Sequence, residues 1–401
     1  MNNSMGDFSV DEIEEQDETS PAMIMLTTLR PVSAISAEAK LEMYLMTFSS
    51  YKMASYINNY VLITEVVVGS VANILALVVM LGLLKLTICN YMAALAVADL
   101  SVVLGPALIR WMQNVSHDPK ALNSYLCRFL NIQSYWSFSL SAWLLVAMTI
   151  DRYIAITFPL KALVWSTPRR ARFVIAALML LMFLINMHFF FTAVVVKRRD
   201  DQQYGCVFYD PYKQFIEDVW PWLDATVYSF IPFSCLLVFN YLIIRSQKRS
   251  AKAFSSLKGF VKNHKSRSPT RINQKLTMTL LTVSFIFLAL TAPRIILIII
   301  RTSVFNFKPT PTTIDFKVLA DYTLTASIIN VLIIGNHCIN FFLYILTGRK
   351  FRQQIILMFK QCWPKRLKHK NITSVQSCNT ETNSQNGGSR DISTVIDVTE
   401  L

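Results

Sequence analysis

Hydrophobic residues in this chain occur in blocks of membrane length, not at the short intervals typical of a soluble core. A helix of about 20 apolar residues crosses the hydrocarbon core of a bilayer, and the clearest block, Val66 to Leu84, contains no charged residue. The pattern predicts an all-α membrane protein, a seven-transmembrane helix bundle. The expected helices are residues 57–84, 91–113, 124–157, 171–196, 219–244, 276–300 and 318–346.

Polar segments flank the apolar region and divide the chain. Residues 1–56 begin acidic and lack the basic leader of a cleavable signal, so we expect the first helix to insert as its own signal. The last residues are polar and rich in Ser and Thr, which is typical of disorder. We expect an extracellular acidic tail (1–56), the transmembrane domain (57–347), an amphipathic membrane-surface helix (348–364) and a disordered cytoplasmic tail (365–401).

Charge placement predicts the orientation in the membrane. The net charge is +14, and residues 245–275 alone carry ten Lys or Arg and no acid. The segment before the first helix carries the acids instead. This is the positive-inside pattern, with the N-terminus outside and the C-terminus cytoplasmic, and we expect the plasma membrane. The basic loops suit anionic membrane lipid, so we expect no nucleic-acid partner.

Cysteines and glycosylation signals fit the same orientation. Cys127 and Cys206 are the two cysteines expected on the oxidising outer side, so we predict that they form a disulfide. Asn2 and Asn114 begin Asn-X-Ser sequons on the outer side and are predicted glycosylation sites.

An acid and a base stand side by side in Asp151-Arg152-Tyr153, at the end of the third apolar block. Cys127 and Arg152 are 25 residues apart (152 minus 127), which is about 37 Å of helix. That exceeds the roughly 30 Å hydrocarbon core, so the two residues lie at opposite faces of the bilayer. A charged pair at the cytoplasmic end indicates a docking site.

These motifs, with others in order, resemble the rhodopsin family (class A) of G-protein-coupled receptors over residues 57–360. The Asn-Phe pair at Asn340 is similar to some invertebrate-type neuropeptide receptors. The resemblance implies a short eighth helix and an activation motif of Phe287, Pro293, Asn340 and Tyr344. The matching residues are Asn73, Leu95 to Asp99, Cys127, Asp151 to Tyr153, Cys206, Pro232, Phe287, Pro293, Asn336, Asn340 to Tyr344 and Phe351.

Several positions depart from the family pattern. Phe341 replaces the usual Pro, Thr291 replaces the Trp of the aromatic switch, and Asn240 replaces a Tyr. These departures bear on the activation switch, which Phe287 performs if the chain has one.

The resemblance assigns G-protein coupling to Asp151, Arg152 and Tyr153. Arg152 is bound by Asp151 at rest and meets the Gα subunit after the sixth helix moves out. The alternative is an arginine that only anchors the helix at the interface. The segment Arg271 to Lys275 offers no acid to hold Arg152, so raised basal activity is a hypothesis.

Asp99 is a carboxylate in mid-membrane, where an unpaired charge is costly. The resemblance implies an allosteric sodium ion held by Asp99, Ser141, Asn336 and Asn340. The alternative is a hydrogen-bonded polar cluster around a protonated Asp99. No required cofactor is expected.

Two ligand classes are excluded by missing residues. Ser134 stands where a monoamine receptor needs a carboxylate, and no lysine between Lys317 and Lys350 is available for retinal. Charged residues in the outer halves of the helices instead suggest a charged ligand, although Arg294 and Asp224 can also pair with each other. The acidic tail and the aromatic outer ends favour a peptide. The candidate pocket residues are Arg110, Asn131, Tyr135, Phe138, Asp224 and Arg294.

The cytoplasmic segments carry further candidate sites. Ser and Thr of the third inner loop and tail are candidate substrates of receptor kinases, and phosphates there would recruit arrestin. Cys362 is a palmitoylation candidate, and Thr399 to Leu401 has the form of a ligand for a PDZ domain. The alternatives to a receptor are a membrane scaffold acting through its tail and, less in keeping with the sequence, a transporter. No enzyme motif appears.

Overall fold

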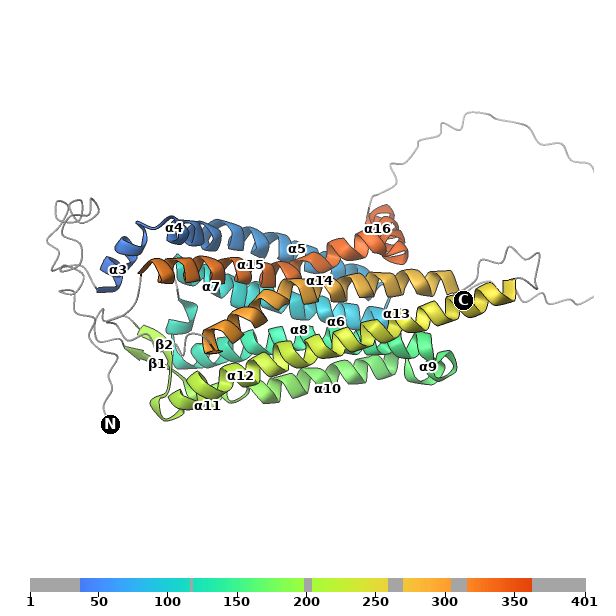
Figure 1. Ribbon diagram of the computed structural model, residues 1–401, viewed down its shortest axis with the longest axis horizontal. Coiled ribbons are helices and arrows are strands. Elements are labelled where there is room, and N and C mark those ends of the chain that lie inside the picture. The colour runs from blue at the N-terminus through green and yellow to red at the C-terminus, as the bar shows by residue number, and fades with distance from the viewer. Residues whose placement is uncertain (1–36, 116–117, 198–203, 259–269, 304–315, 363–401) are drawn as a thin grey trace, which may run out of the picture. The chain divides into compact units, whose positions relative to one another are not determined.

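The computed structural model describes residues 37–115, 118–197, 204–258, 270–303 and 316–362. Residues 1–359 and 360–401 form two separate units, and the helix bundle belongs to the first. Its long helices run side by side (Figure 1). α5 and α15, which are far apart in the sequence, are neighbours in this bundle.

In the part of the chain that the structure describes, seven helices are long and apolar enough to cross a membrane, as predicted. Several are built from two labelled helices joined by a turn or a π-helical segment. The spans are Ser49–Leu81 (α4, Ser49–Tyr56, and α5, Leu62–Leu81), Thr87–Asn114 (α6, Thr87–Val102, and α7, Leu108–Asn114), Ser124–Thr157 (α8), Pro168–Thr192 (α10, Pro168–Asn186, and α11, Phe189–Thr192), Asp210–Ser250 (with α12, Trp220–Asp224, and most of α13, Ile231–Lys258), Leu280–Ile298 within α14 (Thr270–Ser303) and Phe316–Thr347 (α15).

Three shorter α-helices accompany the spans among the described residues. α3 (Ala37–Leu45) precedes the first span and α9 (Pro159–Trp165) follows α8. α16 (Arg349–Cys362) follows α15, where the amphipathic eighth helix was expected. Phe351 of α16 is buried against Tyr344 and Phe341 of α15, with ring centroids 5.7 Å apart in both pairs.

The first helix begins earlier than the hydropathy pattern predicts, at Ser49 instead of residue 57. Residues 49–56 are too polar to be recognised as part of a span. They are held by contacts with the seventh span, because the Ser50 hydroxyl donates a hydrogen bond to Asp321 and α4 packs on α15. A hydropathy window does not detect such contacts.

The predicted end of the fourth helix, at residue 196, is wrong. α11 ends at Thr192, and Ala193–Lys197 forms strand β1, which pairs antiparallel with β2 (Tyr204–Phe208). The run of three valines is apolar, but β-branched residues favour a strand. Cys206 of β2 is bonded to Cys127 of α8, which confirms the predicted disulfide and fixes the hairpin to the N-terminal end of α8.

α8 lies in the centre of the bundle, against α6, α10 and α13. Leu144 and Met148 are almost completely buried. Two tryptophans of α8 donate indole hydrogen bonds to neighbouring backbone, Trp136 to Met179 of α10 and Trp143 to Val227, both at 3.0 Å. Val227 lies in a π-helical segment, Ala225–Phe230. Irregular backbone is tolerated at membrane depth only where its polar groups are satisfied inside the protein, and Trp143 provides such a partner.

Gly69 allows α5 to approach α15 closely. A methyl group at this position would overlap the sulfur of Cys338 and lie 3.2 Å from Val103. Small residues at such interfaces let helices gain van der Waals contact where lipid supplies no hydrophobic driving force.

We expect Gly69→Ala to lower the free energy of unfolding by about 1–3 kcal/mol, because overpacking forces a tight interface apart. Cys338→Ala in the same chain should recover most of the loss, since it removes the overlapping sulfur. Gly82→Ala is the matched control, because its methyl group would approach the end of the flexible Gln354 side chain at 2.5 Å and otherwise make an ordinary contact with the backbone of Val79. The melting temperature of the purified protein in detergent measures all three. Equal melting of Gly69→Ala and Gly82→Ala would contradict the close approach.

Candidate functional site

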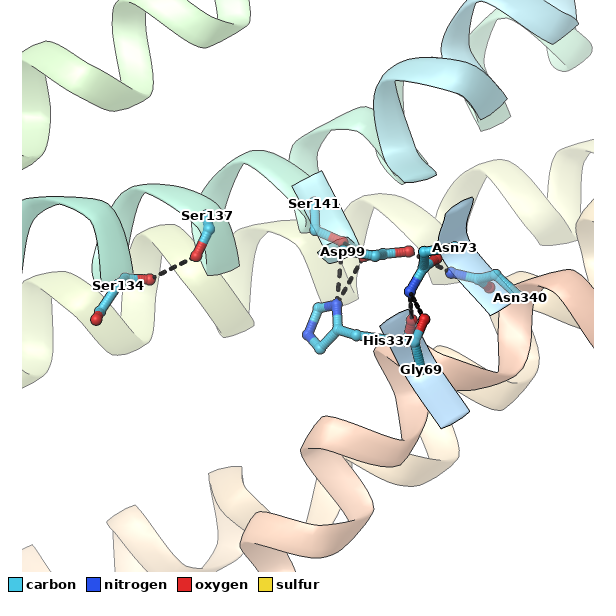
Figure 2. Close-up of polar contacts among 8 residues, drawn as sticks. All are labelled: Gly69, Asn73, Asp99, Ser134, Ser137, Ser141, His337 and Asn340. Carbon is cyan, nitrogen blue, oxygen red and sulfur yellow. Dashed lines mark hydrogen bonds and ion pairs between the residues drawn. The ribbon is translucent and has the colours of Figure 1, made fainter. Parts of the chain in front are cut away.

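Asp99 is the centre of a polar cluster in the middle of the bundle (Figure 2). Its carboxylate is completely buried. Oδ1 accepts a hydrogen bond from the Ser141 hydroxyl at 2.6 Å and lies 2.8 Å from Nδ1 of His337. Oδ2 accepts from the amide of Asn340 at 2.7 Å. Three side chains from α8 and α15 therefore satisfy a carboxylate of α6 that no water reaches.

His337 was missed by the sequence analysis. A single histidine among apolar residues of the seventh helix carries no signal of its own, yet its ring is completely buried against Asp99. Asn336 was expected in this cluster, but among the described residues it makes no hydrogen bond with Asp99. The helical rotation of α15 places position 337, not 336, opposite Asp99.

The side chains around Asp99 do not fit an oxygen-lined sodium site. The cation would need Asp99 Oδ1 and Ser141 Oγ, but the imidazole nitrogen of His337 lies 2.8 Å from the first and 3.3 Å from the second. Hard cations prefer several oxygen ligands, and here an imidazole nitrogen lies beside two oxygens that are already bonded to each other at 2.6 Å. The sodium ion therefore stays a prediction from the resemblance, without support from this geometry.

Asn73 connects the same region to α5. Its amide donates to its own helix at Gly69 O (3.0 Å) and to the backbone oxygen of His337 (2.9 Å). The second bond joins α5 to α15 at the residue that contacts Asp99. One buried asparagine thus ties the first and seventh spans at the cluster (Figure 2).

A cavity of about 250 Å³ opens beside the N-terminal half of α8, at the end of the bundle that the sequence predicts to be extracellular, and is called the outer cavity below. Five of the six candidate pocket residues line it, namely Arg110, Tyr135, Phe138, Asp224 and Arg294. The sixth, Asn131, does not line the cavity. It accepts a 2.7 Å hydrogen bond from Nζ of Lys120, and Lys120 does line the cavity. Lys120 was missed because it lies in a loop between predicted helices. Its backbone N–H is held by the side chain of Asp118.

The charged residues of the cavity resolve one alternative left open by the sequence. Arg294 lies 3.7 Å from Asp224, across the fifth and sixth spans. The guanidinium also lies over the ring of Tyr228, 5.5 Å from its centroid. The two residues therefore pair with each other and still line the cavity.

Aromatic side chains form the wall beside this ion pair. Tyr135 stacks on Phe189 (4.6 Å between centroids) and meets Trp220 edge to face (5.8 Å). Phe138, deeper on α8, meets Tyr228 at 5.6 Å. Such rings supply rigid apolar contact area to a ligand.

At the other end of α8, Arg152 forms an ion pair with Asp151 at 3.0 Å. The arginine side chain is only 12% exposed, and its Nε atom is buried without a hydrogen-bond partner. The ring of Tyr153 packs on Phe239 of α13 (5.6 Å). The predicted motif is therefore assembled and Arg152 has donors to spare.

The residues of the predicted activation motif lie between these two ends. Phe287 and Tyr344 are buried, and the Thr291 hydroxyl donates to the backbone of Phe287 at 2.7 Å. Pro293 lies inside α14, one residue before Arg294. Thr291, which replaces the expected Trp, thus bonds its own helix and leaves Phe287 as the buried aromatic residue there.

The remaining predicted sites lie near the ends of the described segments or outside them. Asn114 is exposed at the end of α7, where a glycan can attach, and its glycosylation stays a prediction. Asn2, Thr399 and Leu401 lie outside the described residues. Cys362 ends α16, but its side chain is not described.

Comparison with known proteins identifies the family. The sequence model described as 7 transmembrane receptor (rhodopsin family) matches residues 72–344. The chain belongs to the rhodopsin family of seven-transmembrane receptors. The receptor and the relatives it matches are not enzymes.

The receptor is similar to proteins from distant animals. A probable G-protein coupled receptor of Caenorhabditis elegans is 23% identical over 75% of this chain and 68% of its own length. G-protein coupled estrogen receptor 1 of Danio rerio is 27% identical, with 73% and 76% covered. The B1 bradykinin receptor of Chlorocebus pygerythrus is 25% identical, with 69% and 74% covered.

We expect His337→Ala to destabilise the receptor by about 1–3 kcal/mol, because a buried carboxylate loses a hydrogen-bond donor. Asn336→Ala is the matched control and should cost less, since Asn336 makes no bond to Asp99.

Melting temperatures in sodium chloride and in choline chloride should be equal for the unmodified receptor. Selective stabilisation by sodium would contradict the argument that these side chains do not fit the ion, and would support the sodium site.

Proposed function

We propose that this receptor transmits the binding of an extracellular peptide at the outer cavity to a heterotrimeric G protein at its inner end. The observation that carries the proposal is the state of Arg152. A buried, permanently charged five-donor group is held by one neighbouring acid and keeps unused donors. Such a group is poised to exchange Asp151 for acceptors on a docking protein.

The peptide part of the proposal rests on the outer cavity. It combines charged side chains with an aromatic wall, which suits a ligand that carries both charge and apolar groups. Its volume of about 250 Å³ lies below the roughly 300–1,000 Å³ of typical small-molecule sites. It therefore suits the end of a longer ligand. The relatives include both a bradykinin receptor and an estrogen receptor, so the proposal draws on the cavity and not on the ligands of relatives.

The cellular setting belongs to the same proposal. We place the receptor in the plasma membrane with its N-terminus outside, because its basic segments follow the positive-inside rule. Receptor kinases, arrestin and a PDZ-domain protein are the proposed partners of its Ser/Thr-rich, Leu-ended tail.

We expect Arg152→Ala to abolish G-protein activation while surface expression persists. The measurement is a panel of G-protein activation sensors in cells, with a neuropeptide library as the stimulus. Arg172→Ala is the matched control, because this exposed arginine lies at the inner end of α10 and bonds only Pro168 of its own helix. Equal signalling from Arg152→Ala and the unmodified receptor would reject G-protein coupling through this motif and favour the tail scaffold.

We expect Asp151→Asn to raise signalling without ligand, by several-fold. The substitution keeps the shape of the side chain but removes the charge that binds Arg152, so the resting state loses its ion pair. The same sensors report basal activity, normalised to receptor at the surface. The double variant with Arg152→Ala should be silent. Unchanged or lower basal activity of Asp151→Asn would show that the pair does not hold the resting state.

A further inference from the structure

Positive charge around the outer cavity exceeds negative charge. Its lining contains three cationic side chains, Arg110, Lys120 and Arg294, and one carboxylate, Asp224. The lining therefore has a formal charge of two positive units. Charge in a poorly hydrated site is costly unless a partner compensates it.

Asp224 compensates only Arg294. The two side chains are 3.7 Å apart, and the ring of Tyr228 faces the same guanidinium. Arg294 thus has an acid on one side and an aromatic face on another. No carboxylate of the lining remains for Arg110 or Lys120, and Asp118, which lies outside the lining, acts on Lys120.

Arg110 has no such compensation. Among the described residues it forms no ion pair or hydrogen bond, and its Nε atom is buried without a partner. The charged group that acts on it is Arg294, which repels it. A guanidinium presents a planar fork of donors that matches a carboxylate, so Arg110 lacks the one kind of partner its geometry suits best.

Lys120 is held by the side chains of Asn131 and Asp118. Its Nζ donates to Asn131 Oδ1 at 2.7 Å, and Asn131 in turn donates to the backbone of Cys127 at 3.0 Å. Burial lowers the pKa of Lys120, and the charge of nearby Asp118 partly offsets this effect. The ammonium group keeps donors beyond the one that Asn131 accepts.

We propose that Arg110, assisted by Lys120, is the subsite that binds the free C-terminal carboxylate of the receptor's ligand. A chain end fits the cavity because the volume is too small for a peptide to pass through. Tyr135 and Phe138 line the same cavity, so the terminal residue carries an aromatic or large apolar side chain. This inference rests on the proposed peptide function and deepens it, because it names the ligand group and the residues that select it.

The test uses the full-length receptor in detergent with two matched probes, N-acetyl-phenylalanine and its amide. They differ only in the terminal carboxylate. We expect the acid to raise the melting temperature in a concentration-dependent way and the amide to act at least tenfold more weakly, because a charge-assisted hydrogen bond is lost.

Substitutions assign this preference to residues. Arg110→Gln should remove the advantage of the acid without lowering the melting temperature of the unliganded receptor, since it removes an uncompensated charge. Arg110→Lys should recover part of the advantage, and Lys120→Gln should reduce it less. Arg128→Gln is the matched control, because Arg128 lies on the outer part of α8, bonds the backbone of Ala193 and does not line the cavity.

Two results would overturn the proposal. The first is equal stabilisation of the unmodified receptor by acid and amide. The second is a preference for the acid that survives in Arg110→Gln. If Arg110→Gln does not fold, the overturning result is a preference for the acid that is unchanged in Lys120→Gln and lost in Arg294→Gln. Signalling that depends on Arg152 can persist in either case, so failure of the subsite is distinct from failure of the proposed receptor function.

Discussion

A single buried carboxylate organises the middle of this bundle. Asp99 has no access to water, so every hydrogen bond it needs must come from neighbouring helices. Ser141 of α8 and both His337 and Asn340 of α15 supply them, and Asn73 joins α5 to the backbone of His337. The requirement to satisfy one acid therefore draws four spans together at one depth. Movement of any of them must exchange these bonds for others.

Hydropathy and motif spacing were sufficient for the fold and for its fixed points. Seven blocks of apolar residues predicted the seven spans, and the compartment argument predicted the Cys127–Cys206 disulfide. The pattern failed where local composition and contact disagree. The valines of β1 are as apolar as a helix, and residues 49–56 are polar but packed on α15. The ends of helices depend on contacts with residues that are distant in the sequence, and a hydropathy average over neighbouring residues does not include these.

The candidate sites also divide into residues that are visible in the sequence and residues that only spatial contacts reveal. Motif residues such as Asp99 and Arg152 were found because their charge is conspicuous in an apolar block. His337 was missed because only the rotation of α15 turns it toward Asp99, and Lys120 because only the loop conformation at Asp118 brings it into the cavity. The pairing of Arg294 with Asp224 could be stated as an alternative but not decided, since it depends on a distance between two spans.

The outer cavity and the central cluster are in physical contact. Phe138 lines the cavity, and its ring meets the ring of His337 edge to face at 5.4 Å between centroids. A ligand that moves Phe138 therefore acts on His337, which bonds Asp99. Another partner of Asp99, Asn340, lies one helical turn before the buried Tyr344. Contact alone does not establish coupling, which requires an element with two arrangements that the ligand binds unequally. The hydrogen bonds of Asp99 are the best candidate for that element. A buried carboxyl group with three partners has few alternative arrangements, and a change from one to another costs the free energy of an unsatisfied polar group.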